Sequence, residues 1–302
     1  MKKIIVFILL LTGSSSYACD ICGCNNGGTF FGILPQSHRQ FAGLRYRYTS
    51  FDSHLSSKVL ATAETFKTTE IWTRLYPVKN LQVLAFLPYH QNVQSRPSDE
   101  FSASLEGIGD ATVLAHYNLL NTFGDTVKIR KVNHSLLIGA GVKAPLGKYQ
   151  YDPYDLSQVA NANFQIGSGS WDMPLNAIYT LTRKGAGLNI NVLYKVNGTN
   201  SNNYKFANQL KTSLLAFKSI YLGNTNLMTS LGVSGDYKRP DLKEGERNLF
   251  TGGYTVMASG GIDYYVGKLA LSLNAQLPII QDLSGGELRV NETLGFGISR
   301  MF

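Results

Sequence analysis

Three cysteines lie within six residues near the start of the chain, at Cys19, Cys22 and Cys24. Three thiols at this spacing could hold a soft metal such as Cu(I) or Zn²⁺, with a histidine completing the shell. In an oxidising compartment, three cysteines also form one disulfide and leave one thiol over. Lipid attachment at Cys19 is a third reading, although Ser16 stands where a lipoprotein signal carries an aliphatic residue. The sequence leaves these alternatives open.

A second set of charged and polar residues is spaced through segments of alternating polarity. It comprises Arg45, Arg47, Glu70, Arg74, Asp110, His116, Lys143, Asp172, Asn189, Asn191, Lys195, Lys211, Asp236, Asp263 and Arg289. If these side chains face one common interior, their burial requires water or oppositely charged partners. A water-filled channel and a closed, salt-bridged lumen both meet that requirement. Cations slightly outnumber acids in the set, which favours anionic or polar solutes.

Catalysis and nucleic-acid binding find little support in the sequence. A barrel hydrolase needs a Ser or Asp activated by a His that has an orienting partner. No serine-containing motif stands beside His90 or His116. There is also no basic run or nucleic-acid-binding motif. We therefore expect neither an enzyme nor a nucleic-acid-binding protein.

The first residues predict export. Lys2 and Lys3 precede an apolar run over residues 4–11, and Ser16-Tyr17-Ala18 is a small-x-small cleavage site before Cys19. The run is too short to span a bilayer as a helix, which takes roughly 20 apolar residues. We expect a signal peptide over residues 1–18, a Cys-containing segment over 19–39 and one β-barrel domain over 40–302.

The last segment of the chain shows what kind of strand the predicted barrel domain contains. Leu294, Phe296, Ile298 and Phe302 share one side of an extended strand with Val290, and the other side carries Arg289 and small or polar residues. A strand has a period of two, so this side-by-side contrast predicts one apolar and one polar face. In an outer-membrane barrel the apolar face meets lipid and the polar face lines the lumen.

The same alternation predicts about twelve strands. They cover residues 40–51, 62–76, 81–93, 107–120, 133–145, 167–182, 187–196, 204–220, 226–238, 252–266, 269–280 and 288–302. Short turns alternate with long loops, as in barrels that have short periplasmic turns and long external loops. The expected fold is an all-β, transmembrane, antiparallel up-and-down barrel.

Composition agrees with a barrel more than with a secreted sandwich. The chain has 30 Gly, 17 Tyr and 15 Phe, and only 16% of its residues are charged. Aromatic girdles and a lumen lined by small polar residues account for this mixture. The formal charge of +8 includes Lys2 and Lys3 of the signal. The remaining excess suits contact with lipopolysaccharide phosphates, or a lumen that favours anions.

Several motifs resemble one family. Gly107-Ile108-Gly109-Asp110, the stretch Gly141 to Gly147 that contains Lys143-Ala144-Pro145, and Gly167 to Asp172 look like strand ends of the outer-membrane transporters of the MetA-pathway of phenol degradation family. The Cys19–Cys24 segment is similar to that of Bacteroidetes-type members. The resemblance covers most of the chain that follows the signal, and its motifs are short and rich in Gly. It implies a Gram-negative outer-membrane barrel that passes small molecules, and it carries over no binding residues.

The sequence thus predicts a passive, porin-like channel in the cell outer membrane. Its partners would be outer-membrane lipid, lipopolysaccharide, a small anionic or polar solute, and the outer-membrane assembly machinery, reached through the strand that ends at Phe302. The alternative is a non-conducting binding or structural barrel whose cysteines bind Cu, Zn or a partner.

Overall fold

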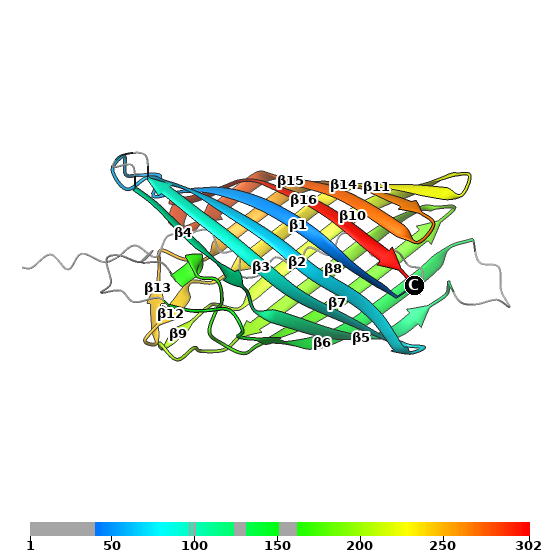
Figure 1. Cartoon of the computed structure of the whole chain (residues 1–302), viewed down its shortest axis with the longest axis horizontal. Coiled ribbons are helices and arrows are strands. Elements are labelled where there is room, and N and C mark those ends of the chain that lie inside the picture. Colours follow the sequence, from blue (N-terminus) through cyan, green and yellow to red (C-terminus); the bar gives the residue numbers. More distant parts are fainter. Residues whose placement is uncertain (1–39, 97, 99–100, 124–130, 151–161) are drawn as a thin grey trace, which may run out of the picture.

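The computed structural model describes residues 40–302 except 97, 99–100, 124–130 and 151–161. The predicted signal peptide, with residues 1–18, and the segment with Cys19, Cys22 and Cys24 lie outside the described residues. No helix in the described part of the chain is long and apolar enough to cross a membrane. Nearly all of the described secondary structure is strand, and the strands form an elongated barrel (Figure 1).

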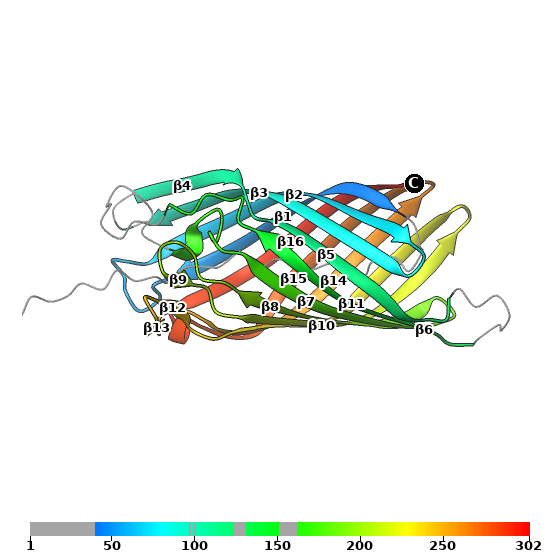
Figure 2. The same ribbon diagram turned by 90° about the horizontal axis from the view of Figure 1, so that it is seen from below.

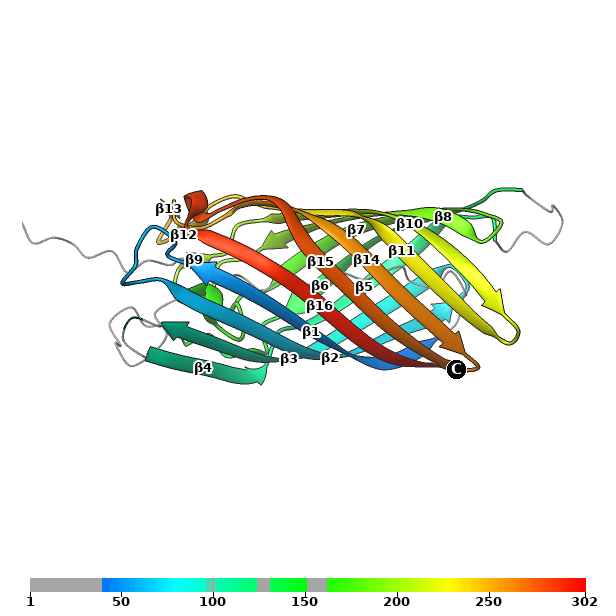
Figure 3. The same ribbon diagram turned by 90° about the horizontal axis from the view of Figure 1, so that it is seen from above.

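The wall of the barrel has twelve positions, and each strand is antiparallel to its neighbours. The strands are β1 (Phe41–Ser53), β2 (Thr62–Val78), β3 (Leu81–Arg96), β4 (Phe101–Ile108), β5 (Ala111–Asn121), β6 (Asn133–Ala144), β7 (Asp172–Arg183), β8 (Ala186–Asn197), β10 (Gln209–Leu222), β11 (Thr225–Lys238), β14 (Gly253–Val266), β15 (Leu269–Leu283) and β16 (Leu288–Met301). β1 pairs with β16 from Phe41 opposite Met301 to Ser53 opposite Leu288, which closes the cylinder (Figure 3). The predicted antiparallel barrel of about twelve strands is confirmed.

One position in the wall is shared by β4 and β5. β4 pairs with the C-terminal half of β3, and β5 pairs with its N-terminal half. In Figure 2, β4 lies beside the part of β3 that extends past the start of β5. Between them Gly109 and Asp110 are both buried, which breaks the period of two, and the Gly109 N–H donates to the Pro88 carbonyl over 2.8 Å. The single strand predicted over residues 107–120 is therefore two strands separated by a break.

The two ends of the barrel differ in their connections. Four of the five connections at one end have only two residues, at 79–80, 184–185, 223–224 and 267–268, and the fifth, between β5 and β6, is longer and covers 122–132. Lys184 and Gly185 both have positive φ, 49° and 75°, as a tight hairpin that follows the twist of its strands requires. The other end carries the longer loops and a small sheet of β9 (Tyr204–Lys205), β12 (Asp241–Lys243) and β13 (Glu246–Asn248). We call these the turn end and the loop end.

The outer face of the wall is apolar. Leu44, Ile71, Leu294, Phe296 and Ile298 are among many large apolar side chains that are exposed there. A soluble monomer rarely exposes so much contiguous apolar surface, whereas lipid solvates it readily. The period of two places apolar groups outside and a mixed set inside.

Two bulges interrupt that period near the loop end. Ser50 lies opposite Glu292 but Phe51 lies opposite Val290, so Asn291 is an extra residue in β16. Ile279 is likewise extra in β15, between Pro278 and Ile280. A bulge places two residues opposite one. Beyond it, the residues that face the lumen are therefore the ones that strict alternation along the sequence would place outside.

The bulge in β16 corrects two expectations. Val290 was predicted on the lipid side, and it is buried inside the barrel together with Leu288. Arg289 was predicted in the lumen, and it lies on the outer side, where it is exposed and pairs with Asp52 over 2.8 Å. Beyond the bulge, Leu294 to Phe302 keep the predicted alternation.

Candidate functional site

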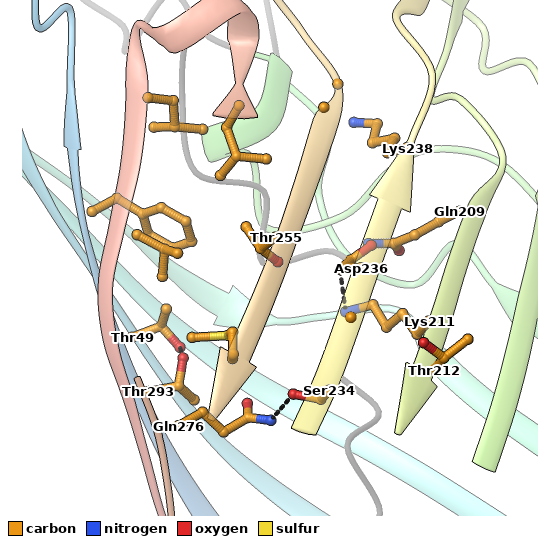
Figure 4. A pocket seen from close by; sticks show the side chains of 18 of the residues that line it. Thr49, Gln209, Lys211, Thr212, Ser234, Asp236, Lys238, Thr255, Gln276 and Thr293 are labelled. Atoms are coloured by element: carbon orange, nitrogen blue, oxygen red, sulfur yellow. Dashed lines mark hydrogen bonds and ion pairs between the residues drawn. The ribbon is translucent and has the colours of Figure 1, made fainter. Parts of the chain in front are cut away.

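A cavity of about 190 Å³ lies in the half of the lumen near the loop end. We call it the outer cavity (Figure 4). It is lined by inward-facing residues of β1, β8, β10, β11, β14, β15 and β16, and by Asn163, Thr251, Gly252 and Ser284 from the connections. Strands from most of the circumference therefore contribute to one enclosed space.

One side of the outer cavity is charged. Lys211 of β10 pairs with Asp236 of β11 over 3.1 Å, and Gln209 donates to both oxygens of that carboxylate over 2.8 and 2.7 Å. Lys238, two residues along β11, pairs with Asp241 over 2.8 Å. Figure 4 shows Gln209, Lys211, Asp236 and Lys238 together on one side of the space. With Arg47 of β1, three cations and one carboxylate line the outer cavity.

Another side of the outer cavity is apolar. It is formed by Phe51 of β1, Met257 of β14, Leu283 of β15 and Leu288 and Val290 of β16. Phe51, Met257, Leu288 and Val290 belong to one buried cluster. This surface exists because the bulge at Asn291 turns Leu288 and Val290 inward.

A smaller cavity of about 90 Å³ follows toward the turn end. We call it the inner cavity. Arg47, Gln276 and Thr293 line both cavities and therefore separate them. Gln276 donates to Ser234 and Ser259 over 2.9 and 3.1 Å, which fixes its amide in this partition.

Aromatic and paired groups fill much of the space around the inner cavity. Arg45 pairs with Glu70, and its guanidinium lies 4.9 Å from the centre of the Trp72 ring. Trp72 contacts Phe41 with ring centres 4.4 Å apart. Asp263 also lines this cavity. Nearer the turn end, Arg74 lies over the Phe41 ring at 4.8 Å.

A buried ion-pair cluster lies at the break between β4 and β5. Lys143 of β6 pairs with Asp110 and with Asp172, the latter over 2.8 Å, and also donates to the Ser168 hydroxyl. Asp110 accepts the backbone N–H groups of Gly147 and Ser168 over 3.0 and 2.9 Å. We call these residues the Lys143 cluster. The carboxylates of the Lys143 cluster have their ion-pair and hydrogen-bond partners within the protein itself. The cluster therefore links the break between β4 and β5 to the connection between β6 and β7.

Four further predicted lumen residues, His116, Asn189, Asn191 and Lys195, lie on the inner face of β5 and β8. His116 contacts Asn176 over 2.7 Å, and Asn176 donates to Asn191 over 2.6 Å. Asn189 donates to Thr180 over 2.8 Å. Lys195 continues the same face of β8 as Asn189 and Asn191, one pair of residues beyond Leu193.

The structure therefore divides the predicted set into separate groups. Arg47, Asn191, Lys211 and Asp236 line the outer cavity, and Arg45, Glu70 and Asp263 line the inner cavity together with Arg47. Asp110, Lys143 and Asp172 form their own cluster, and Arg289 lies outside. The prediction omitted Lys238, although it follows Asp236 at the period of two. It also omitted Phe51, Met257, Leu288 and Val290, because apolar residues were assigned to lipid.

The predicted metal site at Cys19, Cys22 and Cys24 lies outside the described residues. Within the described ranges, no group of three or more His, Cys, Asp or Glu side chains is arranged to hold a metal ion. The cysteine segment keeps its alternatives of metal, disulfide and lipid.

Comparisons with known proteins agree with this architecture. The model of the family described as MetA-pathway of phenol degradation matches residues 41–279. The structure is similar to the COG4313 outer membrane channel from Pseudomonas putida F1, with a TM-score of 0.65 and 12% identity over 90% of this chain and 100% of that chain. The beta domain of the Bordetella autotransporter Brka matches with a TM-score of 0.48 and 11% identity, over 87% of this chain and 100% of that chain. No curated protein matches by sequence. At 12% identity, the likeness to the Pseudomonas putida channel shows the fold alone.

Proposed function

Because the chain belongs to the MetA-pathway of phenol degradation family and has the fold of outer-membrane barrels, we propose that it is an outer-membrane channel through which small solutes diffuse passively. One observation carries the proposal: two cavities lie in series along the lumen and have the side chains of Arg47, Gln276 and Thr293 as their common boundary. Side chains can move on short timescales, so a partition made of side chains can admit solutes where a folded plug would not.

The proposed location follows from the same surfaces. The apolar outer face favours lipid, and the loop end would face outward if the short connections are periplasmic. Lipopolysaccharide and the outer-membrane assembly machinery are the partners proposed for this location.

The charge of the outer-cavity lining supports small anions as the class of solute. Three cations and one carboxylate line the outer cavity, and with Asp241, the partner of Lys238, they carry a net charge of +1 that favours anions. The inner cavity has a volume of about 90 Å³, and this small volume excludes large solutes.

Planar-bilayer recording on the full-length protein tests this function. We expect discrete conductance steps, and under a KCl gradient a reversal potential displaced toward that of chloride. A bilayer that stays silent with correctly folded protein contradicts the channel. Silence combined with Cu or Zn binding that Cys22→Ser and Cys24→Ser abolish supports the alternative of a non-conducting, metal-binding barrel.

A variant of the inner half tests which part limits conduction. Trp72→Ala removes the ring that packs between Phe41, Phe86 and Arg45, so it widens the lumen at the inner cavity. We expect unit conductance to increase. Trp171→Ala is the matched control, because Trp171 is exposed and lines neither cavity. Equal conductance of Trp72→Ala and wild type would place the limiting constriction elsewhere.

A further inference from the structure

The outer cavity combines two surfaces that one class of solute satisfies together. A fully polar solute such as a sugar has nothing to hydrogen-bond along Phe51, Leu288 and Val290. A fully apolar solute leaves the charges of Lys211 and Asp236 without water. A molecule with one apolar part and one charged end meets both requirements.

The sign of the charged end follows from the lining. Arg47, Lys211 and Lys238 face the cavity with Asp236, and Lys238 is paired with Asp241, so these five groups carry a net charge of +1 that attracts an anion and repels a cation. Lys211 has three N–H donors and Asp236 has Gln209 as a second partner. A bound carboxylate can therefore share the Lys211 ammonium without leaving Asp236 alone. The side chains of Lys211 and Asp236 are 26% and 31% exposed, so both are accessible from the lumen.

The size of the apolar part follows from the cavity volume. An apolar cavity of roughly 150 Å³ holds one benzene molecule in a protein interior. The outer cavity measures about 190 Å³, which leaves room for one ring or short alkyl chain with a small charged group. Water against Phe51, Met257 and Val290 is poorly hydrogen-bonded, and displacing such water favours binding.

We propose that the outer cavity is a binding site for small amphipathic monoanions, of which aromatic carboxylates are the simplest. The carboxylate lies at Lys211, and the ring lies against the apolar side formed with Leu288 and Val290. This proposal rests on the proposed channel function, because it names the solute class that the lumen selects.

Binding to the full-length protein in detergent, measured by calorimetry, tests the site without requiring conduction. Benzoate is the probe, acetate supplies the charge without the ring, and benzyl alcohol supplies the ring without the charge. We expect benzoate to bind at least about tenfold more tightly than either, since each half contributes to affinity. Benzoate that binds no better than both controls overturns the proposal.

Two variants assign the two halves of the ligand to the two surfaces. Val290→Thr keeps the shape of the side chain and adds a hydroxyl, so it should weaken benzoate by about tenfold and leave acetate unchanged. Lys211→Gln should weaken benzoate and acetate and leave benzyl alcohol unchanged. Arg289→Gln is the matched control, because it changes the neighbour of Val290 that lies outside the lumen. Benzoate binding that both Val290→Thr and Lys211→Gln leave unaltered places the ligand elsewhere and overturns the proposal.

The same probes separate this proposal from the channel. A conducting protein that does not bind benzoate refutes the binding site alone. A silent protein that binds benzoate with the expected variant pattern refutes conduction and keeps the site.

Discussion

Two groups of charges in the lumen have similar composition and different surroundings. In the Lys143 cluster, the side chains of Lys143, Asp110 and Asp172 are 7%, 6% and 1% exposed. At the outer cavity, Lys211 and Asp236 are several times more exposed. The Lys143 cluster also receives backbone N–H groups and hydroxyls from the connection between β6 and β7. The charges of the Lys143 cluster have their partners within the protein, whereas Lys211 and Asp236 also face the outer cavity.

The difference shows that charge in a lumen does not identify a solute site. Asp110 already accepts hydrogen bonds from Lys143, Gly147 and Ser168, so a solute has few places left to bind. Lys211 lines the outer cavity, and 26% of its side chain is exposed. We infer that the Lys143 cluster is structural and that the charges at Lys211 act on solutes.

The largest expected effect comes from removing the cation of the Lys143 cluster. Lys143→Met leaves Asp110 and Asp172 buried without their cation, which typically costs about 3–5 kcal/mol. The temperature at which the folded band disappears in heat-modifiability electrophoresis should fall markedly. A variant as stable as wild type would contradict the structural role of the Lys143 cluster.

A smaller and different effect is expected at the outer cavity. Lys211→Met breaks a partly exposed pair, so the loss of stability should stay below about 1 kcal/mol. Removing the positive charge should instead move the anion-to-cation permeability ratio toward unity, measured from the reversal potential. Strong destabilisation without a change in selectivity would reverse the assignment of the two groups.

The smallest effect is expected on the outer side of the wall. Arg289 and Asp52 form a pair whose side chains are 55% and 32% exposed. Arg289→Met should change stability by less than about 0.5 kcal/mol and leave selectivity unaltered. Both are measured in the same electrophoresis and bilayer assays. A change of selectivity would show that Arg289 acts on the lumen from outside, contrary to its placement.

Much of the barrel can be predicted from local patterns. The period of two and the two-residue turns are properties of neighbouring residues, so they locate the twelve strands and the turn at Lys184 and Gly185. The break at Gly109 and Asp110 depends on the pairing of β3 with both β4 and β5. β3 and β5 are not consecutive strands, so their pairing is not visible in a local pattern, and a single strand was predicted there.

The candidate site was harder to predict from the sequence for the same reason. The bulge at Asn291 is a property of the pairing between β1 and β16, whose residues are more than 200 positions apart. Without it, alternation assigns Arg289 to the lumen and Val290 to lipid. The saturation of Lys143 likewise depends on partners 33 and 29 positions away in the chain, at Asp110 and Asp172. Sequence patterns indicated these charges but did not distinguish the satisfied from the accessible ones.

The bulge at Asn291 absorbs one extra residue in β16, so the residues on both sides of it keep their facing relative to β1. Deleting Asn291 would therefore restore strict alternation and still leave Leu288 and Val290 in the lumen and Arg289 outside. A change of one residue in strand length is tolerated at this position without exchanging the groups that line the lumen. The same change in a regular stretch of strand would exchange them.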